Sequence, residues 1–296
     1  MADFVIITDS TSDLCEDMRR KYDVEYVKMN FVVGGKEYPA DLDWKDFSSK
    51  EYYDLLRGGE RITTTQVTRE TYLDAFKKHL DAGKDILYIG CSSALSGSIN
   101  LAKLLAEELE REYPERKVFC IDSLCSSLGQ GYMVIWASGL RAEGKSVQQV
   151  AQTIEENKLK VNQCGTVESL EYLRRAGRVK ASKAFFGNLF GVKPIIISDR
   201  IGQNFAVKKA KGAVNAKKEI AASIAEAVVD PEGQCLYISH ADALESAQQL
   251  KEEILKLAPF GEVYIDVIGP IVGASVGPGT IIAFCYGKEV MIEGKE

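Results

Sequence analysis

Three unbroken apolar runs in the first half of the chain each end in a serine-containing turn. The runs occupy residues 4–7, 86–89 and 118–121. Strands that are apolar at every position belong in the middle of a parallel sheet, where helices cover both faces. Ligands of such sheets bind beyond the carboxyl ends of the strands, where these turns would lie. The pattern therefore predicts a ligand site built from turns.

Helical periodicity alternates with strands over residues 1–158. A helix is expected to begin at Ser12, and a strand at 25–33 is expected to break in a hairpin-like turn at Gly34 and Gly35. Further helices are expected at residues 48–56, 68–80, 96–113, 129–141 and 146–157. This alternation predicts a three-layer α/β/α domain, in which helices cover both faces of a parallel sheet.

Residues 159–296 show a different order of elements, which predicts a second, two-layer α/β domain with a mixed sheet. Strands at 193–198 and 204–208 are joined by a polar hairpin, and the strand at 235–239 is flanked by two helices. Two more strands are expected near 262–267 and 280–286, with a glycine-rich loop at 273–279 between them. We place the domain boundary near residues 157–162.

Composition narrows the possible classes of function. The chain has 296 residues, and its net charge of −6 argues against nucleic acid or an anionic membrane as the main partner. No apolar stretch approaches the roughly 20 residues of a membrane span. The first apolar run, residues 4–7, is too short for a signal peptide, and the segment around it is too acidic. Seven cysteines without a C-x-x-C pair, and only two histidines, predict reduced thiols in a cytoplasmic protein with no metal and no cofactor.

Hydroxyl side chains gather at two predicted helix starts. Ser92, Ser93, Ser96 and Ser98 follow one strand, and residues 63–65 are three threonines. Serine and threonine are ordinary N-cap residues, so capping alone explains each turn. If the two clusters meet, their hydroxyls and the positive ends of the helices would instead bind a carboxylate. Because no lysine lies in these turns, neutral donors would hold the anion.

Other chemical motifs are incomplete. Residues 90–94 approximate the nucleophile elbow of a serine hydrolase, with Ser92 as nucleophile and His240 as the later histidine, but Ala94 stands where glycine is usual. Asp9 begins half of a phosphatase-type D-x-D motif, and no glycine-rich phosphate-binding motif of a nucleotide site occurs. A serine hydrolase that uses Ser92 and His240 stays as the alternative function.

A phenylalanine-rich segment follows at residues 184–190. Phe185, Phe186, Leu189 and Phe190 would cover most of a helix surface with apolar side chains. Packing in the domain core explains such a segment. The alternative is that these side chains line a tunnel for a long apolar ligand, since apolar pockets favour domain interfaces.

Taken together, several motifs resemble the DegV family of bacterial fatty-acid-binding proteins. The matching segments in chain order are T-D-S-T-S-D-L at 8–14, T-T-Q at 64–66, S-S-A-L-S-G-S at 92–98, I-D-S at 121–123, L-E-Y-L-R-R-A-G-R at 170–178, K-P-I at 193–195 and the glycine-rich residues 273–279. Each motif alone is weak, but together they span nearly the whole chain in the right order.

The resemblance implies two domains that hold a long-chain fatty acid between them, with the carboxylate bound by hydroxyls of the N-terminal domain. The implied ligand-binding residues are Thr64, Thr65, Ser93, Ser96, Gly97, Arg178, Gly273 and Ser275. Such a protein is a carrier rather than an enzyme. Some members present the acid to a separate fatty-acid kinase that makes acyl phosphate, assisted by an arginine that matches Arg178 and by a histidine. Ser275 stands in place of this histidine, so binding is expected to persist and coupling to a kinase is left open.

Overall fold

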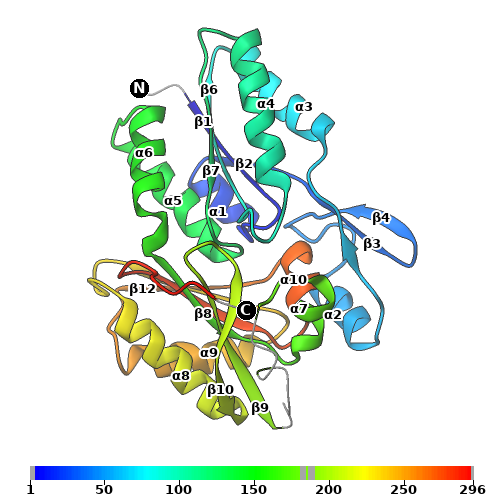
Figure 1. Cartoon of the computed structure of the whole chain (residues 1–296), viewed down its shortest axis with the longest axis vertical. Helices are drawn as coiled ribbons and strands as arrows, with labels where there is room; N and C mark the ends of the chain where they lie inside the picture. Colours follow the sequence, from blue (N-terminus) through cyan, green and yellow to red (C-terminus); the bar gives the residue numbers. More distant parts are fainter. Residues whose placement is uncertain (1–3, 181–184, 186–190, 295–296) are drawn as a thin grey trace.

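The computed structural model describes residues 4–180, 185 and 191–294. Figure 1 shows one sheet in the upper half of the molecule, a second sheet in the lower half, and a small third sheet beside the first. None of the helices in this described part combines the length and the apolar composition that a membrane crossing requires.

The first sheet is a parallel sheet of four strands. Its order is β2 (Val24–Val27), β1 (Phe4–Asp9), β6 (Asp85–Gly90) and β7 (Val118–Asp122). The helices around it are α1 (Glu16–Lys21), α3 (Arg69–Asp81), α4 (Ser98–Glu112), α5 (Leu128–Ala142) and α6 (Val147–Asn157). Helices α3 and α4 pack on one face and α5 and α6 on the other (Figure 1). The predicted three-layer arrangement is therefore confirmed.

The second sheet is mixed and has six strands. Its order is β10 (Asn204–Lys211), β9 (Val192–Ser198), β8 (Val161–Thr166), β13 (Ile281–Tyr286), β11 (Cys235–His240) and β12 (Glu262–Val267). Only β11 and β12 run parallel; the other neighbours are antiparallel, including the predicted hairpin between β9 and β10. Helices α8 (Gly212–Ala227) and α9 (Leu244–Leu255) pack on one face, as a two-layer domain requires.

Shorter elements connect the two main sheets. The third sheet is antiparallel, in the order β4 (Lys36–Pro39), β3 (Asn30–Val33) and β5 (Thr63–Thr64). The short helices nearby are α2 (Ser49–Arg57), α7 (Leu170–Ala176) and α10 (Pro270–Val276), and the 3-10 helix η1 (Lys158–Lys160) leads into β8. Helix α10 contacts α2, α7, β3 and β5, so it joins a segment near the end of the chain to the third sheet.

Three local predictions were wrong. No helix begins at Ser12, because Asp13 has a positive φ of 52° that a helix does not allow, and α1 starts only at Glu16. The strand expected at 25–33 is two strands, β2 and β3, in different sheets. The predicted glycine-rich loop begins as helix α10, with Pro270 in its first turn. Position 273 of this helix suits a glycine, because the Tyr53 hydroxyl lies 2.6 Å from where a Cβ would be.

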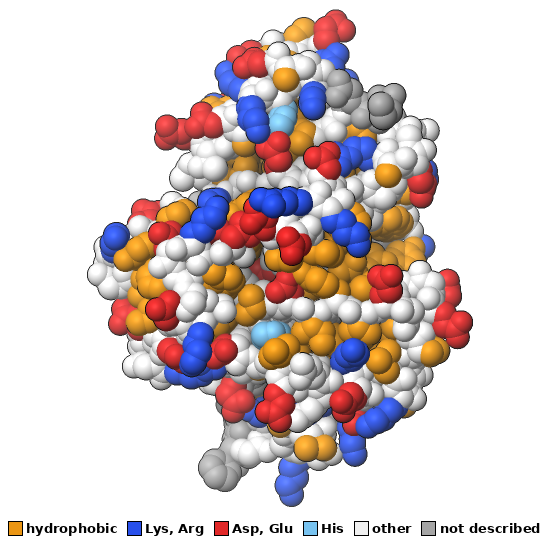
Figure 2. All heavy atoms as spheres, turned by 180° about the vertical axis from the view of Figure 1, so that it is seen from behind, with side chains coloured by type: hydrophobic (Ala, Val, Ile, Leu, Met, Phe, Trp, Pro, Cys, Tyr) orange, Lys and Arg blue, Asp and Glu red, His pale blue; other side chains and the backbone are white. Residues whose placement is uncertain are grey.

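Helix α5 unites the two main sheets. It packs on β1 and β6 with one side and on β8, β11 and β13 with the other. Buried apolar side chains from both sheets accordingly form one continuous cluster, whereas a second cluster lies beneath α8 and α9. Figure 2, a view from behind, shows apolar side chains gathered across the middle of the molecule and charges of both signs scattered around them. The two sheets are thus fixed to each other by a shared core.

Asp13 is a buried polar link across this shared core. Its carboxyl oxygens accept hydrogen bonds from the Ser127 hydroxyl at 2.6 Å and from the Gly269 N–H at 2.9 Å. The Ser127 hydroxyl lies 3.0 Å from that of Ser239 on β11. Burial, with the nearby charges of Asp266 and Asp9, raises the pKa of Asp13 to about 8 against the lowering effect of the two hydrogen bonds.

This raised pKa predicts a pH-dependent stability. The native state keeps a proton that the unfolded chain releases, so the free energy of unfolding should fall as the pH rises from about 4 to 8. Asp13→Asn should flatten this fall, because the amide imitates the protonated carboxyl and does not titrate. Urea unfolding at pH 5, 6, 7 and 8 measures both slopes, and equal slopes in the two proteins would contradict the assignment.

Candidate functional site

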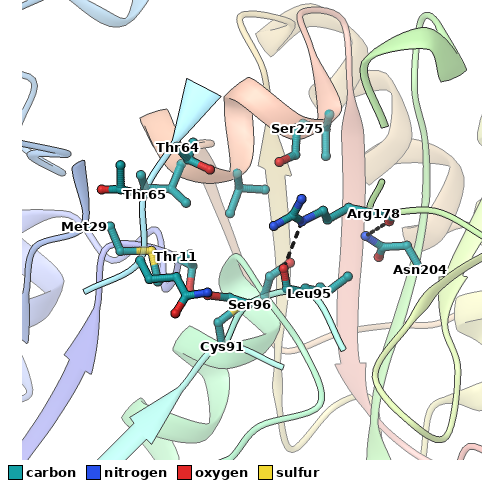
Figure 3. Close-up of a pocket in the computed structure, with 15 residues that line it drawn as sticks. Thr11, Met29, Thr64, Thr65, Cys91, Leu95, Ser96, Arg178, Asn204 and Ser275 are labelled. Carbon is teal, nitrogen blue, oxygen red and sulfur yellow. Dashed lines mark hydrogen bonds between the residues drawn. The ribbon is translucent and has the colours of Figure 1, made fainter. Parts of the chain in front are cut away.

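A cavity of about 150 Å³ opens where the turn after β6, strand β5 and helix α10 meet. We call it the hydroxyl pocket. Its walls are Thr11, Met29, Thr64, Thr65, Gln66, Cys91, Leu95, Ser96, Ser126, Arg178, Asn204, Ile271, Val272, Ser275 and Val276. Figure 3 shows Thr64 on β5 and Ser275 on α10. The Arg178 guanidinium lies between these two residues and Ser96, which belongs to the turn at residues 92–98 after β6. We call this turn the serine turn. The two hydroxyl clusters singled out in the sequence therefore do meet.

Backbone pairing positions the threonines. Strand β5 pairs with β3, and the Thr65 N–H donates to the Asn30 carbonyl at 2.9 Å just beyond the strand. The serine turn is held from within: the Ser96 N–H donates to the Ser92 carbonyl at 2.9 Å, and the Ser96 hydroxyl to that of Ser98 at 3.1 Å. Both segments are thus fixed before any ligand arrives.

Asp9 lies fully buried beneath the pocket and orders two of its walls. Its carboxylate accepts hydrogen bonds from the N–H groups of Thr11 at 2.9 Å and Cys91 at 3.2 Å, and from the Tyr88 hydroxyl at 2.7 Å. The Gln130 amide donates to the same carboxylate at 3.2 Å. Burial, together with the charge of Asp9, raises the pKa of the Cys91 thiol, so this wall is uncharged at neutral pH.

The second half of the chain adds a cation to the pocket, whereas the turns alone predicted only neutral donors. The Arg178 Nε donates to the Leu95 carbonyl at 3.0 Å, and the Asn204 amide donates to the Arg178 carbonyl at 3.1 Å (Figure 3). The guanidinium also bonds to the Ala176 carbonyl. An anion in the pocket would therefore meet a positive charge as well as neutral donors.

A smaller apolar pocket lies on the far side of Val276 and Asn204. Its volume is about 20 Å³, and its walls are Gln163, Gly165, Thr166, Val167, Leu173, Ile196, Asn204, Val276, Thr280 and Ile282. Val276 and Asn204 also belong to the hydroxyl pocket. The two pockets thus form a polar compartment and an apolar compartment that share one wall.

Comparison with known proteins agrees with this architecture. The family model described as "Uncharacterised protein, DegV family" matches residues 3–288. A DegV domain-containing protein of Clostridium perfringens (strain 13 / Type A) is 34% identical over 287 residues, which cover 97% of this chain and 98% of that protein. The chain belongs to the DegV family.

Two solved DegV structures show the same fold. A fatty-acid-binding DegV family protein from Thermus thermophilus superposes with a TM-score of 0.86 at 28% identity, covering 97% of this chain and 100% of that one. DegV from Bacillus subtilis, a fatty acid binding protein, gives a TM-score of 0.82 at 25% identity with the same coverage.

The structure brings together five of the eight ligand-binding residues that the DegV resemblance implied: Thr64, Thr65, Ser96, Arg178 and Ser275. The other three are not walls of the pocket. Ser93 is exposed, and its N–H donates to the Asp122 carboxylate at 3.2 Å. Gly97 faces the Gln66 amide, and Gly273 faces Tyr53.

Several pocket walls had no clear signal in the sequence. Asn204 and Ile271 are ordinary residues of a strand and a helix, and only the fold brings them to the pocket. Gln66 could have been found, because it completes the T-T-Q motif. Of the proposed tunnel residues, Phe186, Leu189 and Phe190 lie outside the described residues. Phe185 is partly buried and packs against the shared core.

The geometry gives no support to a serine hydrolase. The fully buried Ser92 hydroxyl donates to the Gly202 carbonyl at 2.8 Å, and His240 Nδ1 accepts the Ala243 N–H at 3.2 Å. Burial also lowers the pKa of His240. In the part of the chain that the structure describes, no hydrogen bond joins Ser92 to His240. Nor do those residues contain a group of three or more His, Cys, Asp or Glu side chains that could hold a metal ion.

Proposed function

We propose that this DegV protein binds a long-chain fatty acid, with the carboxylate in the hydroxyl pocket and the acyl chain directed past Val276 into the apolar pocket. The observation that carries the proposal is the pairing of a polar and an apolar compartment across one shared wall. The fatty acid binding described for the T. thermophilus and B. subtilis relatives supports it.

The carboxylate determines how the ligand is oriented. A buried charge without partners is very costly, so donors must converge on it. Thr64, Thr65, Ser96 and Ser275 offer hydroxyls, and Arg178 adds a charge-assisted bond, which is shorter and stronger than a neutral one. A carboxylate fits this set better than a neutral head group would.

The acyl chain supplies most of the affinity. A dozen buried methylene groups gain roughly 10 kcal/mol at about 0.8 kcal/mol each, of which association and ordering remove several kcal/mol. A cavity of about 150 Å³ resembles one that accepts benzene, so the hydroxyl pocket holds the head group and only the first carbons. The remaining carbons of the acyl chain must widen the apolar pocket, whose volume is about 20 Å³.

Ser96→Ala is expected to weaken fatty-acid binding by about 1–3 kcal/mol, because the carboxylate loses a hydrogen-bond donor. Titration with a fluorescent fatty acid measures the change. Ser93→Ala is the matched control on the same turn, since Ser93 lies outside the pocket and should leave the affinity unchanged. Equal affinities of the Ser96→Ala variant and the unchanged protein would reject the role of Ser96.

We further propose that the protein performs no chemistry alone and acts in the cytoplasm, where it hands its ligand to a fatty-acid kinase. All seven cysteines lie among the described residues and none of them is paired, which fits a reducing compartment. Two experiments test these steps. Solvent extraction of the purified protein followed by mass spectrometry should release a fatty acid, and a mixture with a fatty-acid kinase and ATP should form acyl phosphate. Extraction without any lipid would contradict binding; absence of acyl phosphate would contradict only the kinase step.

A further inference from the structure

A second cavity, of about 160 Å³, adjoins the hydroxyl pocket on the side of strand β5 and helix α7. We call it the arginine pocket. Arg61, Arg175 and Arg178 lie in its walls together with the hydroxyl residues Thr63, Thr64 and Ser275. Thr64, Arg178 and Ser275 also belong to the hydroxyl pocket, so the two cavities meet at these side chains.

In the part of the chain that the structure describes, the arginines of this pocket have no carboxylate partner, unlike neighbouring arginines. Close by, Arg57 pairs with Asp54 and Asp242, and Arg174 pairs with Glu171. Among the described residues, no ion pair to a carboxylate is found for Arg61, Arg175 or Arg178. A chain with a net charge of −6 thus gathers three uncompensated positive charges around one cavity.

Local contacts keep the charges of Arg175 and Arg178 in place without neutralising them. The Arg175 guanidinium lies 5.3 Å from the centre of the Tyr172 ring, a cation–π distance, and the Tyr172 hydroxyl donates to the Leu56 carbonyl at 2.9 Å. Arg178 is fixed by the Leu95 carbonyl. Guanidinium groups match the oxygens of phosphate in a bidentate geometry, and the hydroxyls add donors of their own.

We infer that the arginine pocket is a binding site for a phosphate group. At neutral pH a phosphate group carries between about one and two negative charges, and it has several oxygens that accept hydrogen bonds. Because the pocket meets the hydroxyl pocket at Thr64 and Ser275, the phosphate could be inorganic phosphate or the head of an amphiphile whose chain lies where the fatty acid is proposed to bind. The amphiphile form rests on the proposed function; the phosphate site itself does not.

The first experiment compares hexadecyl phosphate with hexadecanoate by calorimetry on the full chain. The unchanged protein should bind hexadecyl phosphate at least about tenfold more tightly. The double variant Arg61→Ala/Arg175→Ala should lose this preference while its affinity for hexadecanoate changes less than about threefold. The control Arg69→Ala/Arg174→Ala removes the same charge from arginines that already pair with Glu108 and Glu171, and it should keep the preference.

The second experiment titrates inorganic phosphate alone. Saturable binding that the double variant loses and the control keeps would support the site with free phosphate as its source, even if the two lipids bind equally well. Equal lipid affinities together with no saturable phosphate binding would overturn the inference, as would a preference that survives in the double variant. If hexadecanoate does not bind at all, the proposed function fails, and the inorganic phosphate titration still decides this site.

Discussion

Asp9→Ala is expected to lower the free energy of unfolding by about 3 kcal/mol or more. The change removes the acceptor of two backbone N–H groups, those of Thr11 and Cys91, in a fully buried place. Each buried donor left without a partner costs about 1–3 kcal/mol. The Tyr88 hydroxyl is less affected, since it can turn toward the hydroxyl of Tyr72, 2.8 Å away.

Urea unfolding measures the loss, and two variants make the result specific. Asp46→Ala removes an exposed carboxylate and should stay within about 0.5 kcal/mol of the unchanged protein. Asp9→Asn keeps one carbonyl oxygen as an acceptor and should fall between the two. Because Thr11 and Cys91 are walls of the hydroxyl pocket, fatty-acid affinity should fall in the same order. A loss no larger than that of Asp46→Ala would mean that the Asp9 hydrogen bonds do not hold the turn.

Local patterns were sufficient to predict much of the fold. The apolar runs at β1 and β6 are buried on both faces of the first sheet, which is why they identified a parallel sheet. The run at β7 belongs to the same sheet, but it forms the edge strand, and Phe119 and Cys120 are only partly buried there. Helix α2 was also predictable, because Ser48 and Glu51 form a reciprocal capping box at its start. In both cases, the residues that determine the element lie within it.

The errors arose where distant residues determine local structure. Residues 273–279 were expected to form a loop because they include three glycines, but residues 273–276 belong to helix α10. Gly273 in this helix packs against Tyr53, whose hydroxyl lies 2.6 Å from where a Cβ would be and donates to the Ile268 carbonyl at 2.7 Å, more than 200 positions away in the sequence. Arg178 reaches the serine turn through a bond to Leu95, a separation of 83 positions. Such contacts leave no trace in a local pattern, so only the resemblance to DegV proteins pointed to Arg178.

The site itself combines both kinds of information. Thr64 and Ser96 could be identified in the sequence as hydroxyl residues near predicted helix starts, where helix capping explained them equally well. In the structure, β5 and the serine turn line one cavity, so both residues are walls of the same pocket. The apolar compartment was invisible for a different reason. Its walls Leu173, Ile196 and Ile282 come from three separate elements of the second sheet region and read in the sequence as ordinary core residues.

Val276→Phe is expected to weaken hexadecanoate binding about 100-fold. Val276 is buried and forms the wall between the hydroxyl and apolar pockets, so a larger ring there should close the path of the acyl chain. Exclusion of four methylene groups costs about 3 kcal/mol at about 0.8 kcal/mol each, which is a factor of more than 100 in affinity. Calorimetric titration of both proteins with hexadecanoate measures this change.

Chain length separates a blocked path from a damaged protein. Hexanoate should fit within the hydroxyl pocket, so its weaker affinity should change less than about threefold in Val276→Phe. Overpacking a core position costs about 1–3 kcal/mol of stability, and thermal unfolding will show whether the variant remains folded. Val276→Ala opens the same wall and should keep hexadecanoate affinity within about tenfold. If a folded Val276→Phe variant binds hexadecanoate normally, the acyl chain leaves the hydroxyl pocket by another route, and the apolar pocket has no part in binding.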